Sequence, residues 1–250
     1  YIVAGKAGHV LQFRPLAQAL LPQWHLHGIL YPIYAGSNAR YASVQDLSDN
    51  MLHAAQQISD PIVLMGYSMG GAVAYEMACK LMQDGRDVSV IMIDTSVPAI
   101  RRKHSLFVRT LRDWIRLRPL TRAIRRLKRK LKGIPPKAKP FHGPNHDNIE
   151  RFAEDNRIAV RSYRPSKSDV PIVLIRTVPA RWTGWLRRDY WPSKDYGWSK
   201  VARVVSVVDC VAGHRSIVRP AYLETLSRAS DEAIGDAYRY HGGTGDQENS

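Results

Sequence analysis

The chain has 250 residues, 44% of them hydrophobic, and a formal net charge of +15. This length and composition fit one globular domain with a substantial core. The sequence has no apolar run of eighteen residues and no leader with a cleavage site, so it predicts neither a membrane span nor a secretory signal and favours a cytoplasmic location. Two distant cysteines exclude a disulfide framework, and the histidines lack the neighbouring ligands of a metal site, so we expect no metal.

Short apolar runs alternate with segments of helical periodicity along the chain. The predicted strands cover residues 1–4, 62–65, 88–93, 171–175 and 203–208, and the predicted helices cover residues 10–21, 45–58, 69–84, 148–162 and 217–230. Near-continuous apolar strands indicate a parallel sheet that is covered on both faces, and their alternation with helices predicts a doubly wound α/β domain. The sequence begins at Tyr1 inside an apparent strand, so we expect a piece of a longer polypeptide.

The positive charge is concentrated in one segment, residues 101–140. This segment contains sixteen Lys and Arg residues and one acid, Asp113, whereas the rest of the chain has 21 basic and 21 acidic residues. Two helical patterns separated by Pro119 fill the segment, and the second has an apolar stripe with basic residues around it. We therefore predict a basic helical insertion over residues 97–147. The last ten residues, 241–250, have little apolar content and are predicted to be a disordered tail.

The stretch "GYSMGG" at residues 66–71 lies directly between a predicted strand and a predicted helix. In this context, G-x-S-x-G is typical of a nucleophile elbow, a tight turn that raises a serine hydroxyl above the edge of the sheet. Gly66 and Gly70 are then required because side chains there would collide with the turn and the adjacent helix. Ser68 is the predicted nucleophile.

A serine hydroxyl needs a base that removes its proton, and the base needs a carboxylate that orients it. In hydrolases with this elbow the order along the chain is serine, acid, histidine. His214, in "VAGHRS" just after the predicted strand 203–208, fits as the base.

Two positions remain open for the acid. Asp94 ends the predicted strand 88–93, so its carboxylate would stand at the carboxyl edge of the sheet. The usual hydrolase position follows the predicted strand 171–175, where the first acids are Asp189 and Asp195. We favour Asp94.

The developing oxyanion needs a pair of backbone N–H donors. One is expected from Met69, immediately after the nucleophile, and the other from the glycine-containing loop "AGKAGH" after the first predicted strand. We assign the second donor to the backbone of Lys6.

These residues resemble type I thioesterase domains, the terminal release domains of nonribosomal peptide and polyketide synthases in the α/β-hydrolase superfamily. The likeness covers most of the chain apart from residues 101–147 and the tail. It rests on the following stretches, in chain order: "VAGKAGHVLQFRPLAQAL", "GYSMGGAVAYEMACKL", "IDTSVP", "AVRSYRP" before "PIVLIR", and "DYGW" followed by "GHRSIV". The serine stretch and "IDTSVP" are its specific part.

The resemblance implies an α/β-hydrolase fold over residues 1–240, with a mostly parallel sheet and with residues 97–147 as a variable helical lid. In the family the acid commonly follows the strand that Asp94 follows here, which supports Ser68, Asp94 and His214 together. The implied activity is release of an acyl, peptidyl or polyketide chain from a phosphopantetheine arm through a serine acyl-enzyme, by hydrolysis or cyclisation. The implied partner is a carrier domain in the same polypeptide. No cofactor, nucleic acid or membrane partner is expected.

Three interpretations of the basic lid remain open: a solvated face, a docking surface for the acidic carrier or its phosphate, and adsorption to an anionic membrane or nucleic acid. Two other functions also remain open. One is a free esterase or lipase, which needs no carrier. The other is a non-catalytic α/β-hydrolase scaffold that binds an acidic partner, although a scaffold would not need a serine, an acid and a histidine in this order.

Overall fold

The computed structural model describes residues 1–6, 9–35, 40–56, 58–97, 146–178 and 194–242. In these ranges six strands form one sheet in the order β2-β1-β3-β4-β5-β6, and every neighbouring pair is parallel. The strands are β1 (Ile2–Val3), β2 (Gly28–Ile29), β3 (Ile62–Tyr67), β4 (Val88–Ile93), β5 (Pro171–Thr177) and β6 (Arg203–Cys210). The prediction of an α/β domain with a parallel sheet is confirmed.

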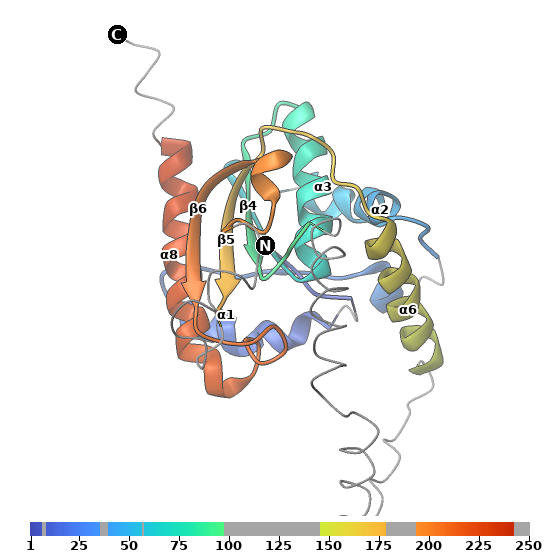
Figure 1. The fold of residues 1–250 in the computed structure, drawn as a ribbon, viewed down its shortest axis with the longest axis horizontal. Coiled ribbons are helices and arrows are strands. Elements are labelled where there is room, and N and C mark those ends of the chain that lie inside the picture. Colours follow the sequence, from blue (N-terminus) through green and yellow to red (C-terminus); the bar gives the residue numbers. More distant parts are fainter. Residues whose placement is uncertain (7–8, 36–39, 57, 98–145, 179–193, 243–250) are drawn as a thin grey trace, which may run out of the picture.

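Helices cover both faces of this sheet (Figure 1). The described α-helices are α1 (Arg14–Leu20), α2 (Val44–Gln56), α3 (Met69–Gln83), α6 (His146–Ser162) and α8 (Leu223–Gly242), and the short 3-10 helices are η1 (Val10–Phe13), η2 (Pro32–Ala35), η3 (Trp198–Lys200) and η4 (Pro220–Tyr222). α8 packs on β4, β5 and β6 and against α1, whereas α3 packs on β1, β3 and β4 and against α2. No helix in the described ranges is long and apolar enough to cross a membrane.

The core lies where α3 meets the central strands. All six residues of β4 are buried, and α3 is buried from Met69 to Cys79. Small residues such as Ala72, Ala74 and Ala78 on α3 let the helix lie close to the sheet, while Trp198 and Tyr75 fill the space beside it. Because each fully buried large apolar side chain contributes about 1.5–3 kcal/mol, this core holds the helix that follows the serine in a fixed position.

The structure differs from the sequence prediction at several element boundaries. Strand β2 was not predicted, because two residues give too short an apolar run to recognise. The last helix begins at Leu223 rather than at residue 217, since Ile217 lies in the turn that follows Gly213 and Pro220 starts a separate 3-10 helix.

That helix also runs beyond its predicted end. It includes the first two residues of the predicted tail, where the side chain of His241 is 5% exposed and pairs with Asp87 at 2.5 Å. Helix α6 begins at His146, inside the predicted insertion. The rest of the insertion, residues 98–145, and residues 243–250 of the tail lie outside the described residues, so the lid and the tail stay predictions.

Candidate active site

The register of the parallel strands brings distant parts of the chain to one edge of the sheet. Tyr67 pairs with Ile93, and Ile93 pairs with Ile175. The residues that follow these strand ends therefore lie side by side at the carboxyl edge, where open α/β sheets bind their ligands. Ser68 follows β3 and Asp94 follows β4, while His214 lies in the loop that follows β6.

Ser68 occupies a strained turn between β3 and α3. Its φ of 56° and ψ of −116° are unusual for a residue with a side chain. Two hydrogen bonds hold the turn: the N–H of Ser68 donates to the carbonyl of Ile93 at 2.9 Å, and the hydroxyl of Thr95 donates to the carbonyl of Ser68 at 2.8 Å. The strain is therefore maintained from the neighbouring strand β4 rather than by the turn alone.

Two glycines make this turn possible. A Cβ atom on Gly66 would lie 2.4 Å from the backbone of Gly70 and Gly71, and one on Gly70 would lie 2.3 Å from the carbonyl oxygens of Val3 and Ala4. The clash at Gly66 is with the first turn of α3, as the sequence analysis expected. The second is with β1, so Gly70 lets the start of α3 lie directly against the strand that leads to Lys6.

Ser68, His214 and Asp94 are joined by hydrogen bonds. The hydroxyl of Ser68 lies 3.0 Å from Nε2 of His214, and Nδ1 of His214 lies 2.6 Å from Oδ2 of Asp94. With Nδ1 as the donor to the carboxylate, the Nε2 lone pair is left to accept the serine proton. The structure thus brings together the three residues that the sequence analysis selected from separate parts of the chain.

Asp94 is held by donors on both of its oxygens. Oδ1 accepts hydrogen bonds from the N–H of Thr177 at 3.2 Å, from its hydroxyl at 2.7 Å and from the hydroxyl of Tyr196 at 3.0 Å. Burial pushes the pKa of Asp94 upward, but the bonds from His214 and Thr177 and the attraction of His214 outweigh it, so this pKa lies below the ordinary value. The carboxylate is therefore ionised and fixed in orientation beside the imidazole.

The alternative acids occupy other places. The Asp195 carboxylate accepts hydrogen bonds from the N–H groups of Gly197 and Ser199 and so forms the turn that leads into η3. Asp189 lies outside the described residues. Thr177, the last residue of β5, donates to Asp94 through its hydroxyl.

Tyr67 contacts His214 and was not selected from the sequence. Its ring stacks on the imidazole with a centroid distance of 5.4 Å, and its hydroxyl donates to the main-chain carbonyl of His214 at 2.5 Å. Burial, followed by the charge of Asp94, raises the pKa of Tyr67 to about 12, so the hydroxyl keeps its proton at ordinary pH. Nothing in the spacing of the motif indicates this role, because the x position of G-x-S-x-G accepts many residues.

The two predicted oxyanion donors lie at the start of α3 and in the loop after β1. Met69 is the first residue of α3, so its N–H has no acceptor within the helix. Lys6 lies in the loop after β1, one residue beyond Gly5, at which a Cβ atom would approach the ring of Tyr67 to 3.2 Å. The loop that carries Lys6 thus passes beside Tyr67, the residue before Ser68.

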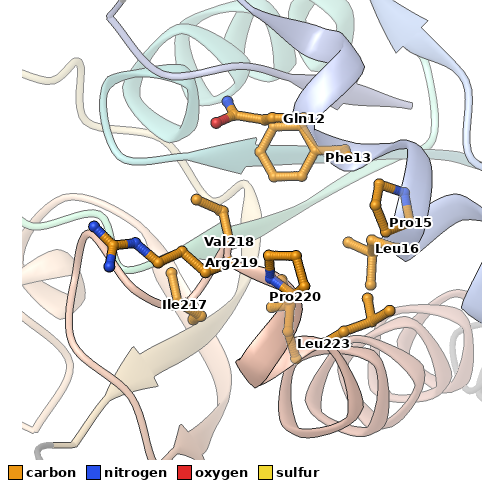
Figure 2. Close-up of a pocket in the computed structure, with 10 residues that line it drawn as sticks. Gln12, Phe13, Pro15, Leu16, Ile217, Val218, Arg219, Pro220 and Leu223 are labelled. Atoms are coloured by element: carbon orange, nitrogen blue, oxygen red, sulfur yellow. The ribbon is translucent and has the colours of Figure 1, made fainter.

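A small apolar pocket lies beside the site rather than on it. It is a shallow hollow, partly open to solvent, between η1 with the start of α1 and the segment between His214 and α8 (Figure 2). Phe13 points into the pocket opposite Val218, and its ring also makes an edge-to-face contact with the ring of Tyr67, with the centroids 6.0 Å apart. In the described part of the chain, no group of three or more His, Cys, Asp or Glu residues could hold a metal ion.

The chain is similar in sequence to several known proteins. The model of the family described as "Thioesterase domain" matches residues 2–142, which include Ser68 and Asp94. Two curated relatives are the vanchrobactin synthetase VabF of Vibrio anguillarum, 30% identical over 101 residues, and the enterobactin synthase component F of Escherichia coli K12, 33% identical over 95 residues. These alignments cover 39% and 37% of this chain but only 4% and 7% of the relatives.

Solved structures share the fold over nearly the whole chain. The NocB thioesterase domain from the nocardicin cluster superposes with a TM-score of 0.66 and 20% identity, covering 94% of this chain and 92% of that one. A Vlm2 thioesterase domain superposes with a TM-score of 0.63 and 21% identity, covering 92% of each chain. The α/β-hydrolase fold and the resemblance to thioesterase domains are confirmed.

Proposed function

Because the chain belongs to the thioesterase domain family, whose members are serine hydrolases, we propose that it releases an acyl or peptidyl chain from the phosphopantetheine arm of a carrier protein through an acyl-enzyme on Ser68. The observation that carries this proposal is the continuous hydrogen-bonded series from Ser68 through His214 to Asp94. Such a series supplies a nucleophile, a base and an orienting carboxylate in the order that acyl transfer requires.

In the first step, the Ser68 oxygen attacks the thioester carbonyl while Nε2 of His214 takes the serine proton. The N–H groups of Met69 and Lys6 stabilise the oxyanion of the tetrahedral intermediate. The carbon–sulfur bond then breaks, and the imidazolium returns the proton to the leaving thiol. Asp94 stabilises the imidazolium and keeps Nδ1 protonated throughout.

In the second step, water or a hydroxyl or amine of the acyl chain attacks the ester on Ser68, with His214 again acting as the base. Attack by water releases a free acid, and attack from within the chain releases a ring. The apolar pocket of Figure 2 lies next to Tyr67 and the histidine loop, outside the reacting atoms. Both outcomes use the same residues of this chain.

The carrier partner is proposed from the relatives. The two curated relatives are named as a synthetase and a synthase component, and the parts that match this chain make up less than a tenth of the length of each. A four-domain nonribosomal peptide synthetase also matches the fold, with this chain covering 19% of it. We therefore propose a carrier domain in the same polypeptide, one α/β-hydrolase domain over residues 1–240, and a lid at residues 97–147 that selects the acyl chain.

Intact mass spectrometry after incubation with an acyl-pantetheine thioester tests the proposal. The wild type should gain the mass of the acyl group and release one thiol per enzyme in a burst, whereas Ser68→Ala should gain nothing. Ser227→Ala, which removes an exposed hydroxyl on α8, is the matched control and should behave as the wild type. A thiol burst that persists in Ser68→Ala would refute the acyl-enzyme.

A second comparison separates thioesterase from free esterase activity. A carrier-bound acyl thioester should be used with a higher kcat/KM than the same acyl group on an oxygen ester of similar size. Equal use of both substrates would favour an esterase that needs no carrier.

A further inference from the structure

The structure assigns a positioning role to Asn156 of α6: we propose that its side-chain amide holds the loop after β1 so that the N–H of Lys6 faces the oxyanion. This inference rests on the proposed function, because it concerns the donor that the acyl-transfer step would use. Asn156 lies far from the elbow motif at residues 66–71 in the sequence, because the predicted lid, residues 97–147, comes between them.

The contact is specific and buried. Nδ2 of Asn156 donates to the carbonyl oxygen of Lys6 at 3.0 Å, across 150 residues of sequence. Asn156 is 1% exposed, although the other residues of α6 between positions 154 and 158 are partly or fully exposed. A buried amide in an otherwise solvated stretch of helix needs hydrogen-bond partners, and the Lys6 carbonyl is one of them.

A second side chain holds the same loop two residues earlier. The hydroxyl of the fully buried Tyr31 donates to the carbonyl oxygen of Ala4 at 2.9 Å. The Tyr31 ring makes an edge-to-face contact with Phe152, which lies one helical turn before Asn156 on the same face of α6. One face of α6 therefore supports the loop twice, through Asn156 directly and through Phe152 and Tyr31.

These two bonds act on the peptide groups on either side of the proposed donor. Ala4 O belongs to the peptide group before Gly5, and Lys6 O belongs to the one after Lys6, so the peptide group between them carries the Lys6 N–H. Peptide groups are planar, and each residue turns only about φ and ψ, so fixing both outer planes limits the orientation of the central one. This restraint is needed because Gly5 would otherwise let that plane rotate easily.

The test compares Asn156→Asp with Asp155→Asn, its neighbour on the same helix. Asn156→Asp keeps the shape but replaces the donor with an acceptor that faces the Lys6 carbonyl. Asp155→Asn removes the charge that pairs with Arg40 at 2.7 Å and leaves Asn156 in place. Both are measured with an acyl-pantetheine thioester and with a fluorophosphonate, whose oxygen also occupies the oxyanion hole.

For Asn156→Asp we expect kcat and the rate of phosphonylation to fall by roughly 10- to 100-fold, below the loss for complete removal of a donor. KM should stay within about threefold, and the pH midpoint of kcat should not move, because the Ser68, His214 and Asp94 contacts are intact. Asp155→Asn should keep wild-type rates. Asn156→Leu removes the donor without adding the negative charge of Asn156→Asp, and should show the same loss of kcat. It replaces Asn156→Asp in the test if that variant does not fold.

Equal rates in Asn156→Asp and Asp155→Asn, or a rise in KM that accounts for the whole loss, would overturn the positioning role. A shifted pH midpoint would overturn it as well, because the defect would then lie in the histidine. If the wild type is phosphonylated but never acylated by the thioester, the proposed function fails while phosphonylation still tests Asn156. If the wild type reacts with neither reagent, both proposals fail.

Discussion

The Tyr67 side chain braces His214 from two directions, with its ring stacked on the imidazole and its hydroxyl bonded to the main-chain carbonyl of the histidine at 2.5 Å. Tyr67 is the last residue of β3 and directly precedes Ser68. The residue before Ser68 therefore supports His214, so a shift of β3 would move both together. The hydrogen bond between Ser68 and His214 depends on this shared support.

Loss of the Tyr67 hydroxyl should impair catalysis without removing any residue of the Ser68, His214 and Asp94 series. In Tyr67→Phe the stacked ring stays but the bond to the His214 carbonyl is lost, so the histidine loop can shift. We expect kcat to fall about tenfold, since a small misplacement of a catalytic group is costly. Tyr240→Phe removes a hydroxyl that accepts a hydrogen bond from Arg203 and should leave kcat unchanged. Equal activity of both variants would show that the bond does not position His214.

The ionised Asp94 should make folding stability depend on acid pH. Its pKa is lower in the folded chain than in the unfolded one, so the stabilisation it gives is complete above its ordinary pKa of about 4 and is lost as the pH falls through the depressed folded value. Urea denaturation of the wild type and Asp94→Asn should therefore show a difference in unfolding free energy that is constant near neutral pH and shrinks below about pH 4. A difference that grows on acidification would reverse the assigned direction of the shift.

The same substitution is also expected to lower kcat by roughly 10⁴-fold, because an amide at this position favours the wrong imidazole tautomer. Measurement of thioester turnover at the pH optimum checks this loss. Asp195→Asn, which alters the turn before η3, should retain far more activity if Asp94 is the orienting carboxylate.

Thr177 should matter through its hydroxyl. Thr177→Val keeps the branched shape and the N–H bond to Asp94 but loses the 2.7 Å bond to Oδ1, so the carboxylate is less well oriented and its pKa rises. We expect kcat to fall about three- to tenfold. Thr177→Ser restores the hydroxyl and should recover most of the activity. A serine variant as impaired as the valine one would point to packing instead.

Gly70 at the elbow and Gly85 after the end of α3 should differ in how much stability an alanine costs. Gly70→Ala places a Cβ atom 2.3 Å from two backbone oxygens of the β1 segment, which cannot move without breaking the sheet. We expect a loss of about 3 kcal/mol or more, or no folded protein. Gly85→Ala has nothing within 4 Å but a φ of +76°, and should cost about 1 kcal/mol. Thermal or urea unfolding of the two variants measures the difference, and similar losses would contradict the clash.

The sequence by itself determined the fold class and the chemistry of the site. Apolar strands and helical periods are local patterns, and so is the strand, glycine, serine and helix arrangement around Ser68, so each can be recognised from a few neighbouring residues. Because parallel strands end at one edge of the sheet, the candidate partners of Ser68 had to follow other strands. The expected order of serine, acid and histidine along the chain then favoured Asp94 and His214.

Tertiary structure decided what depends on contacts between distant segments. The choice between Asp94 and Asp195 became a matter of geometry only when β4, β5 and the loop after β6 lay side by side. The hydrogen bonds from Thr177 to Asp94, from Tyr67 to His214 and from Asn156 to Lys6 join residues 83, 147 and 150 positions apart. Such pairings leave no periodic trace in the sequence, because a hydrogen bond depends on where two side chains meet in space and not on their spacing along the chain.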